Sequence, residues 1–398
     1  MGTAHRSHHD VVVVGARAAG AATALLLARM GHDVVVLDRA VFPSDTLSTH
    51  AISRSGVVQL NRWGLLQDVL ATGAPPIRTV SFHIAGETVT RRIKESAGVD
   101  HLVAPRRYAL DTVLADAAAE AGADVRFGVT VTGVRDDPAG RVVGVSARDR
   151  DGNALELDAT FVVGADGLKS RIARSVGAPV DEARRSDGAT HYAYYAGVPW
   201  DGFEYHVGDR AFAGVFPTND GEACIWVCSP SDDAEAIRRR HDSPAAAFDE
   251  MLERAAPELA ARVRTGHRTS PVRGALRLPN QVRRAFGPGW ALVGDAGYHR
   301  DAITGHGISD AFRDADLLAV ALDATLRGDR DETTALSGYE RQRDEALREI
   351  FEITCALATF PPLPEFVALQ KRLSPAIDAE ATALAARPVP GEPLLAVA

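Results

Sequence analysis

The sequence has few cysteines and no long hydrophobic run, and each absence limits the kind of protein it encodes. Only three cysteines occur in 398 residues, which excludes a disulfide framework, and their spacing does not match a zinc site. We therefore expect no metal ion. The apolar runs stop well short of the roughly 18 residues that a membrane-spanning helix needs, and the start lacks the apolar core of a signal peptide. These absences favour a soluble, cytoplasmic protein without a membrane span.

Positive charge is also scarce. The chain has 44 Lys and Arg against 53 Asp and Glu, a formal net charge of -9, and no basic run that would indicate a nucleic-acid partner. The 46% of hydrophobic residues and the length indicate a globular protein of two or three domains. We interpret His5, His8 and His9 as part of an N-terminal tail rather than as a metal site.

Residues 11–40 have the pattern of a strand, a tight turn, a helix and a second strand. An unbroken run of valines precedes Gly15, as in a strand buried on both faces of a parallel sheet. The Ala/Leu-rich segment that follows is strongly helical, and Gly31 supplies a stop signal before the second strand. The segment therefore predicts a βαβ unit.

The turn of this unit has the residues of a dinucleotide site. Gly15 and Gly20 permit a tight turn in which backbone amides and the start of the helix approach a pyrophosphate. Asp38 ends the second strand, where its carboxylate can accept hydrogen bonds from a ribose. The sequence "GARAAG" has Arg17 in place of the second glycine. Its side chain must point away from the phosphates or curl over them.

Two further motifs follow along the chain. Residues 161–177 form an apolar strand that ends in "GADG", with Asp166 and Gly167, before a basic helix. Another predicted strand leads into Gly294 and Asp295, and the loop "TGHGIS" then precedes a long helix. The glycine-lined backbone of that loop suits a flat ring, and the helix N-terminus would stabilise negative charge on it.

These three motifs, in this order, resemble the FAD-dependent family of para-hydroxybenzoate hydroxylase-type monooxygenases, geranylgeranyl reductases and flavin-dependent halogenases. The resemblance covers about residues 10–330. It implies an α/β fold with a Rossmann-like FAD-binding domain. Alternating apolar and polar residues predict a second, antiparallel-sheet substrate domain of the para-hydroxybenzoate hydroxylase type. A periodic C-terminal helix is expected from about residue 330, followed after "PPLP" by an Ala/Pro-rich tail.

The expected domains are discontinuous in sequence. The FAD-binding domain takes residues 1–75, 100–178 and 280–328, and the substrate domain takes residues 76–99 and 179–279. Residues 329–398 form the C-terminal helical segment and tail.

The resemblance also implies which residues hold FAD. The first motif and Asp38 would bind the ADP half, Arg107 would reach the cofactor, and Asp295 would bind the ribityl chain or the nearby ribose. Val131 would lie near the adenosine. The full expected set is Gly15, Arg17, Ala18, Ala19, Gly20, Asp38, Arg39, Arg107, Val131, Asp166, Gly167, Gly294, Asp295, Gly305, Gly307 and Ile308.

Two residues are candidates for catalysis. His50, in the loop "FPSDTLSTHAIS", could donate to the flavin or to a substrate oxygen because its charge can change near neutral pH; a structural loop histidine is the alternative. Tyr192, Tyr194 and Tyr195 cluster on a predicted strand, where alternation puts Tyr195 on the other face from the first two. One face should line the pocket, and Tyr195 is the second candidate. Nearby aromatic residues either enclose a substrate or pack the sheet, namely Phe212, Phe216 and Trp226.

The expected activity is that of a monooxygenase that uses FAD, NADPH or NADH, and O2. Its substrate would be a small aromatic or polyketide-like metabolite of secondary metabolism. A reductase of prenyl double bonds and a non-catalytic flavin-binding protein are the alternatives. The loop around His50 lacks the cysteine that geranylgeranyl reductases carry there. Halogenation is disfavoured because no Trp-x-Trp-x-Ile-Pro motif occurs and Lys169 is one of only three lysines. The pyridine nucleotide has no domain of its own, and the oligomeric state stays open.

Overall fold

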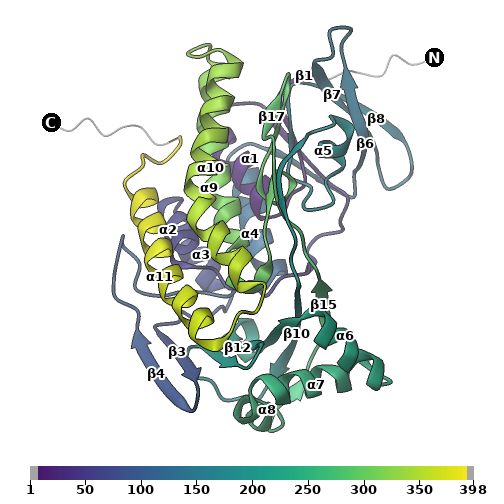
Figure 1. The fold of residues 1–398 in the computed structure, drawn as a ribbon. Coiled ribbons are helices and arrows are strands. Elements are labelled where there is room, and N and C mark those ends of the chain that lie inside the picture. Colours follow the sequence, from purple (N-terminus) through teal and green to yellow (C-terminus); the bar gives the residue numbers. More distant parts are fainter. Residues whose placement is uncertain (1–7, 392–398) are drawn as a thin grey trace, which may run out of the picture.

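The computed structural model describes residues 8–391, and its first sheet is built around the βαβ unit (Figure 1). The central strand β1 (His8–Val14) is parallel to β2 on one side and to β8 on the other. Beside the order β17-β18-β8-β1-β2-β5, the strands β6, β7 and β8 form an antiparallel meander in which β7 pairs with the first half of β8. The other bounds are β2 (Val34–Asp38), β5 (Asp124–Phe127), β6 (Thr130–Asp136), β7 (Val142–Arg148), β8 (Ala154–Gly164), β17 (Phe286–Gly287) and β18 (Trp290–Leu292).

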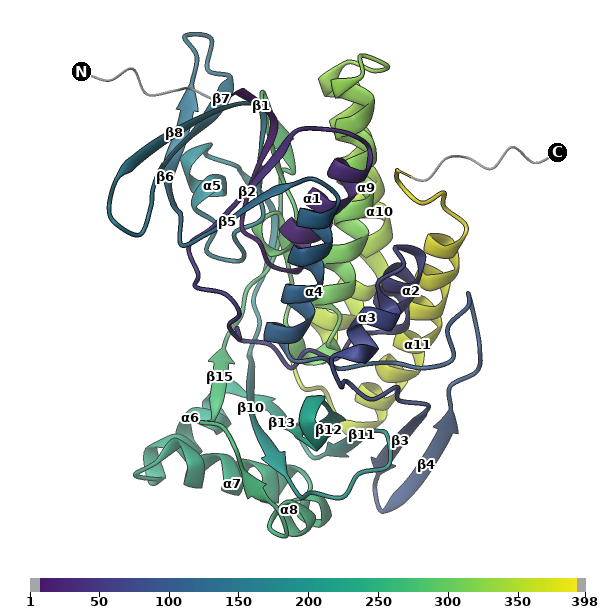
Figure 2. The same ribbon diagram turned by 180° about the vertical axis from the view of Figure 1, so that it is seen from behind.

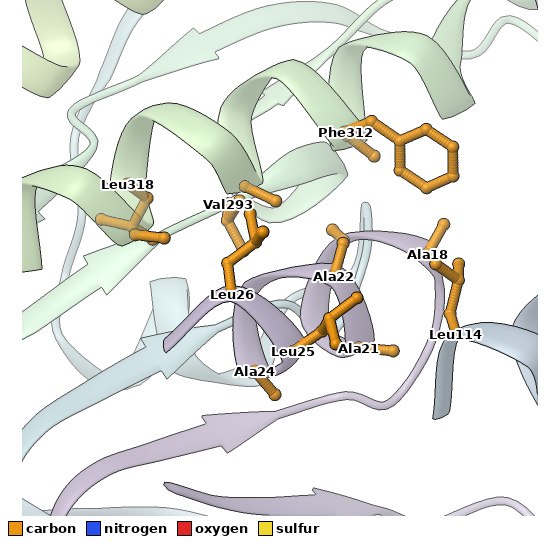
Figure 3. Close-up of a cluster of buried hydrophobic side chains, with 14 of the residues drawn as sticks. Ala18, Ala21, Ala22, Ala24, Leu25, Leu26, Leu114, Val293, Phe312 and Leu318 are labelled. Carbon is orange, nitrogen blue, oxygen red and sulfur yellow. The ribbon is translucent and has the colours of Figure 1, made fainter. Parts of the chain in front are cut away.

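The helix α1 (Ala18–Arg29) packs between this sheet and α9 (Gly307–Leu326). Figure 3 shows small side chains of α1, among them Ala18 and Ala22, beside the larger Leu26 and Phe312. Alanines let the helix approach its neighbours closely, so the valines of β1 are fully buried. The neighbouring helices of this layer are α2 (Arg54–Arg62), α3 (Leu66–Ala71) and α4 (Arg107–Glu120), whereas α5 (Arg171–Ser175) packs on the opposite face of the sheet.

The N-terminal histidines do not all lie in a tail. His8 and His9 belong to β1, and His9 Nδ1 lies 3.0 Å from an Asp33 carboxylate oxygen. The interpretation of these two residues as a terminal tail is therefore wrong. His5 lies outside the described residues.

The second sheet is mostly antiparallel, with the order β14-β10-β13-β12-β11-β3-β4. One exception is the pair β3 and β11, which runs parallel. The strands are β3 (Thr79–Ile84), β4 (Glu87–Arg92), β10 (Gly188–Ala196), β11 (Phe203–Gly208), β12 (Ala211–Pro217), β13 (Ala223–Pro230), β14 (His267–Arg268) and β15 (Arg273–Leu276), which pairs with β10. A small third sheet contains β9 (Val180–Arg184), β16 (Asn280–Arg283) and β19 (Tyr298–His299).

Helices cover both faces of the second sheet, as Figures 1 and 2 show. One face packs against α10 (Glu332–Leu357) and α11 (Leu363–Ala385). The other face is covered by α6 (Ser231–Arg240), α7 (Pro244–Ala255) and α8 (Pro257–Val263). Three short 3-10 helices are η1 (Asn219–Gly221), η2 (Gly294–Ala296) and η3 (Ala302–Thr304).

The architecture confirms the predicted fold class, an α/β nucleotide-binding sheet with a second antiparallel sheet and C-terminal helices. One prediction at the C-terminus is wrong. The segment after Pro364 was expected to be a tail, but residues 363–385 form α11, whose buried Phe366, Leu369 and Leu373 pack against the second sheet and α10. The domain boundaries stay a prediction. Among residues 8–391, the structure has no helix that is both long and apolar enough to cross a membrane.

Candidate functional site

A cavity of about 380 Å³ lies where the two sheets meet. Its walls come from the start of α1, the loop before α2, the start of α4, the loop after β8, β10 and residues 295–311. The three sequence motifs therefore converge on one space. The expected FAD residues that line it are Arg17, Ala18, Ala19, Arg107, Gly167, Asp295, Gly305, Gly307 and Ile308.

The two glycines of the first motif shape the turn without lining the cavity. Gly15 has a φ of 109°, and a side chain there would place its Cβ 2.4 Å from the Ala165 carbonyl oxygen. A Cβ on Gly20 would lie 1.8 Å from the Gly15 carbonyl oxygen. Asp38 accepts hydrogen bonds from the backbone amides of Ala16 at 2.8 Å and Ala40 at 2.7 Å. The turn is thus fixed by backbone contacts that tolerate no side chain at either glycine.

Arg17 points toward the loop that follows β2. Its guanidinium donates to the Ser44 carbonyl oxygen at 2.6 Å and to Asp111 at 2.9 Å, and it lies 5.0 Å from the centre of the Phe42 ring. Arg107 donates to the other oxygen of the fully buried Asp111 at 2.9 Å. The two arginines therefore share one carboxylate, which holds both beside the cavity.

Asp295 faces the cavity and has accessible surface there, although protein surrounds it on the other sides. Burial raises its pKa, against the lowering effect of nearby His299 and Arg107. Gly307 is exposed to the same space and begins α9, whose N-terminal amides carry partial positive charge. Gly305 is left-handed, with a φ of 60°, and ends η3. This segment presents an acceptor and a helix start to the cavity.

Buried charges support the loop from behind. Arg300 is 6% exposed and donates to Asp310 at 2.6 Å, while its Nε and Nη1 have no partner. His306 Nε2 lies 2.6 Å from Glu380 of α11, and Arg313 donates to Glu380 at 2.9 Å. Burial alone would raise the pKa of Glu380. Its electrostatic interactions with His306 and Arg313, together with the hydrogen bond between His306 and Glu380, instead hold this pKa well below its usual range. The loop is therefore tied to the C-terminal helix by ionic contacts.

His50 has an unusual conformation and environment. Its φ of 47° is in the left-handed region, which is strained for a residue with a side chain. Its Nδ1 lies 3.2 Å from the Tyr194 hydroxyl, and its Nε2 has no partner. Burial and the positive charge of Arg106 lower its pKa to about 3. The expectation that His50 changes charge near neutral pH is therefore wrong, and it is a neutral hydrogen-bonding group.

Tyr195 does not lie in the cavity. Its ring packs on the face covered by α7, in the cluster that contains Phe248 and Met251, whereas Tyr192, three residues earlier and on the opposite face, lines the cavity. The Arg268 Nη1 lies 3.5 Å from the Tyr195 hydroxyl. This position does not fit the catalytic role expected for Tyr195, so we do not propose that role.

The remaining expected residues lie outside the cavity wall. Asp166 accepts from the Ser170 hydroxyl at 2.5 Å and the Arg171 amide at 2.6 Å, at the start of α5. A Cβ on Gly294 would lie 2.8 Å from the Ala19 Cβ. Val131 is buried on β6, and Arg39 is exposed after β2.

The aromatic residues of the second sheet pack against each other instead of enclosing an open space. The Phe212 ring lies 5.0 Å from Trp226 and 5.4 Å from Phe366 of α11, measured between ring centres. The sequence left two interpretations open for these residues, enclosure of a substrate and packing of the sheet, and the structure shows packing.

Sequence reasoning missed three charged residues of the site. Arg300 was visible as a charge within the segment "GYHRDAITGHG". Arg106, whose guanidinium lies 3.5 Å from the Tyr194 ring centre, and Glu380 carry no local signal because their partners are distant in sequence. The unpartnered donors of Arg300, the acceptor Asp295 and the start of α9 suit a ligand with phosphates, hydroxyls and a flat polar ring, which are the parts of FAD.

Comparisons with known proteins agree with this fit. A family model described as "FAD binding domain" matches residues 8–354. Digeranylgeranylglycerophospholipid reductase 1 of Methanopyrus kandleri is 29% identical over 378 residues, which is 89% of this chain and 91% of the relative. Menaquinone reductase of Mycolicibacterium smegmatis is 28% identical over 376 residues, which is 90% of this chain and 86% of the relative.

Solved structures share the fold. P. aeruginosa PqsL in complex with 2-aminobenzoylacetate has 25% sequence identity and a TM-score of 0.77, covering 92% of this chain and 100% of that chain. The flavin-dependent brominase Bmp2 is similar in fold alone, with 18% identity, a TM-score of 0.79, and coverage of 95% of this chain and 93% of its own. The match of the family model over most of the chain, together with the fit of the site, shows that this chain belongs to the FAD binding domain family of FAD-dependent oxidoreductases.

Proposed function

We propose that this protein is a monooxygenase that uses FAD, NADPH or NADH, and O2 to hydroxylate a small aromatic or polyketide-like molecule. The observation that carries the proposal is the part of the cavity wall that the expected FAD residues do not supply. Ser48, His50 and Thr190 line it beside apolar side chains such as Leu278 and the ring of Tyr192. An apolar wall with a few polar groups suits a small aromatic substrate with oxygen or nitrogen substituents.

The residues of the cavity have distinct proposed roles. Ala18, Ala19 and the start of α1 would approach the pyrophosphate, Asp295 would accept from the ribityl chain, and Gly307 would lie under the flavin ring. His50 would offer its unpartnered Nε2 to a substrate oxygen or to the flavin. When bound, FAD supplies the redox chemistry. One NAD(P)H, one proton and one O2 convert the substrate to its hydroxylated form, NAD(P)⁺ and water.

The likeness to PqsL supports the substrate class. That structure, at 25% identity, holds 2-aminobenzoylacetate, a small aromatic molecule. Its match covers 92% of this chain, so both the nucleotide sheet and the second sheet are included. We take from it the size and aromatic character of the substrate only.

The second candidate is a reductase of carbon–carbon double bonds in a prenyl chain, which the names of the curated relatives favour. Two observations weigh against it. The loop around His50 lacks the cysteine of geranylgeranyl reductases. The apolar face of the second sheet, which would have to accommodate a long chain, is filled by α10 and α11 through side chains such as Ile353 and Phe366.

Rapid mixing of the reduced enzyme with O2 tests the proposal. The FAD-loaded protein is reduced by NADPH or NADH without oxygen, mixed with O2, and followed in the near-ultraviolet and at the flavin bands. We expect a transient near-ultraviolet species before the oxidised flavin spectrum returns, and incorporation of labelled oxygen into small aromatic acids. Reoxidation in one step, together with turnover of a prenyl substrate under strictly anaerobic conditions, would replace this proposal with the reductase.

A further inference from the structure

Three polar side chains meet on the second sheet, outside the cavity wall. His83 lies on β3, and Glu204 and His206 lie on β11. The parallel register places His83 directly opposite His206, and Ser81 opposite Glu204. Because side chains alternate along a strand, all three project to the same face of the sheet, the one that α8 covers.

The distances within this cluster suit a shared cation. The two imidazole rings are stacked, with centres 4.1 Å apart and planes within 6°, so one ring has to rotate for both Nε2 atoms to point at one ion. The Nε2 atoms of His83 and His206 lie 3.7 Å and 3.5 Å from the same Glu204 oxygen, Oε2. Both separations exceed a normal hydrogen bond. Two ligand atoms bonded to a tetrahedral zinc ion at roughly 2.0–2.1 Å are about 3.4 Å apart, so the observed spacing is close to that of a metal site.

One atom of each of the three side chains lacks a hydrogen-bond partner, whereas Glu204 Oε2 accepts from Arg262. His83 Nε2, His206 Nε2 and Glu204 Oε1 are buried without a hydrogen bond. The residues His206 and Glu204 are only 7% and 3% exposed. Buried polar atoms are rarely left unpaired, and three in one place indicate a ligand that satisfies them together.

Neighbouring side chains prepare these atoms for a metal. His83 Nδ1 lies 2.9 Å from the Thr88 hydroxyl. A proton on Nδ1, donated to that hydroxyl, leaves the Nε2 lone pair free for coordination. Arg262 of α8 donates to Glu204 Oε2 at 2.5 Å, which fixes the carboxylate and leaves Oε1 available. Contacts of this kind around the ligands orient a metal site.

We propose that His83, Glu204 and His206 form a binding site for a divalent transition-metal ion of the kind that imidazole prefers, such as zinc. The ion joins β3 to β11, which are neighbours in the sheet but more than 100 positions apart in the chain. Another cluster of potential ligands among the described residues is His306, Asp310 and Glu380. Its carboxylates are paired with Arg300 and Arg313, and its His306 Nε2 is already in contact with Glu380 at 2.6 Å, whereas the Nε2 atoms of both His83 and His206 have no hydrogen-bond partner.

Cobalt and zinc titrations of the FAD-loaded protein test this site. The protein is first treated with a chelator, and His5→Gln and His8→Gln are introduced to remove competing N-terminal histidines. We expect one equivalent of Co²⁺ to produce tetrahedral absorption bands beyond the flavin bands, and Zn²⁺ to displace it with a Kd below about 1 µM. Zinc should also raise the melting temperature, because it binds only the folded sheet.

Variants at the ligands decide whether the signal comes from this cluster. His206→Gln should weaken zinc binding at least about 100-fold while FAD content stays unchanged. The exposed His267→Gln on β14 is the matched control and should bind zinc as the parent does. If His206→Gln does not fold, His83→Gln, at a less buried position, replaces it in the same zinc-binding measurement. Absence of stoichiometric binding in the parent, or unchanged binding in a folded ligand variant, would overturn the proposal.

Discussion

At the scale of single residues, substitution of Asp295 tests the proposed cofactor site most directly. Its carboxylate faces the cavity, and burial raises its pKa, so a bound hydroxyl donor stabilises its charged form. We expect Asp295→Ala to raise the Kd for FAD about 10- to 100-fold, because a hydrogen bond to a charged group contributes about 1.5–3 kcal/mol. Titration of the apoprotein with FAD, followed by flavin fluorescence, measures this change.

The exposed Asp209→Ala in the second sheet is the control and should leave FAD binding unchanged. The melting temperature of the Asp295→Ala apoprotein should match that of the parent, because the side chain lines a cavity and no core contact is lost. Full FAD affinity in Asp295→Ala would show that the site is assigned to the wrong residues.

Residues whose role depends on their own strand and turn were predictable, and residues whose role depends on a distant partner were not. Gly15 and Asp295 follow strands in recognisable motifs, so the sequence predicted the tight turn at Gly15, and it singled out Asp295, which lines the cavity. The conformation of Arg17 is decided by Asp111, 94 positions away. The lowered pKa of His50 arises from burial and from Arg106, neither of which has a signal in the loop sequence.

At the scale of elements, α11 contacts the loop at residues 300–306, which lines the cavity. Glu380 lies on α11 and contacts both His306 of the loop and Arg313 of α9. We expect Glu380→Gln to weaken FAD binding about tenfold, because a buried ion pair loses one partner and the loop gains freedom. Limited proteolysis between residues 300 and 307 should become faster, and FAD titration measures the change in affinity.

Glu365→Gln in the first turn of the same helix is the matched control, since Glu365 is exposed. An equal loss of FAD affinity in both variants would mean that general destabilisation of α11 is responsible. Unchanged affinity and unchanged proteolysis in Glu380→Gln would show that the ionic contact does not support the loop.

The elements themselves were predictable to different degrees. The valine run and the Ala/Leu-rich segment specify β1 and α1 locally, and alternation in residues 188–230 specifies strands. The parallel pairing of β3 with β11 could not be predicted from the sequence. The two segments are far apart in the chain, and the alternating pattern of each is compatible with several partner strands. The aromatic face of the second sheet was ambiguous because α11, which covers it, was expected to be a tail.

At the scale of the whole molecule, the buried ionisable groups make stability depend on pH in opposing ways. Burial raises the pKa of Asp301 and of Asp314, so these groups favour the folded state as pH falls. His50 acts in the other direction. Its pKa is about 3 in the folded protein against 6.5 for an ordinary histidine, so the unfolded chain takes up a proton that the folded chain does not. The contribution of His50 is therefore present above about pH 6.5 and is lost as pH falls toward 3.

A comparison of His50→Gln with the parent isolates the contribution of His50 to the pH dependence of stability, because both proteins have the same other ionisable groups. The parent should lose stability relative to the variant by about 1.4 kcal/mol for each pH unit below pH 6.5, or roughly 2 kcal/mol by pH 5. Urea unfolding of both apoproteins between about pH 7 and pH 5 measures the two free energies of unfolding. His191→Gln, at a position where burial alone lowers the pKa, is the control for a general effect of removing a histidine and should give a smaller change. A constant difference between the parent and His50→Gln across this range would mean that His50 takes up a proton equally in the folded and unfolded chains, and its proposed role as a neutral donor beside the flavin would then fail.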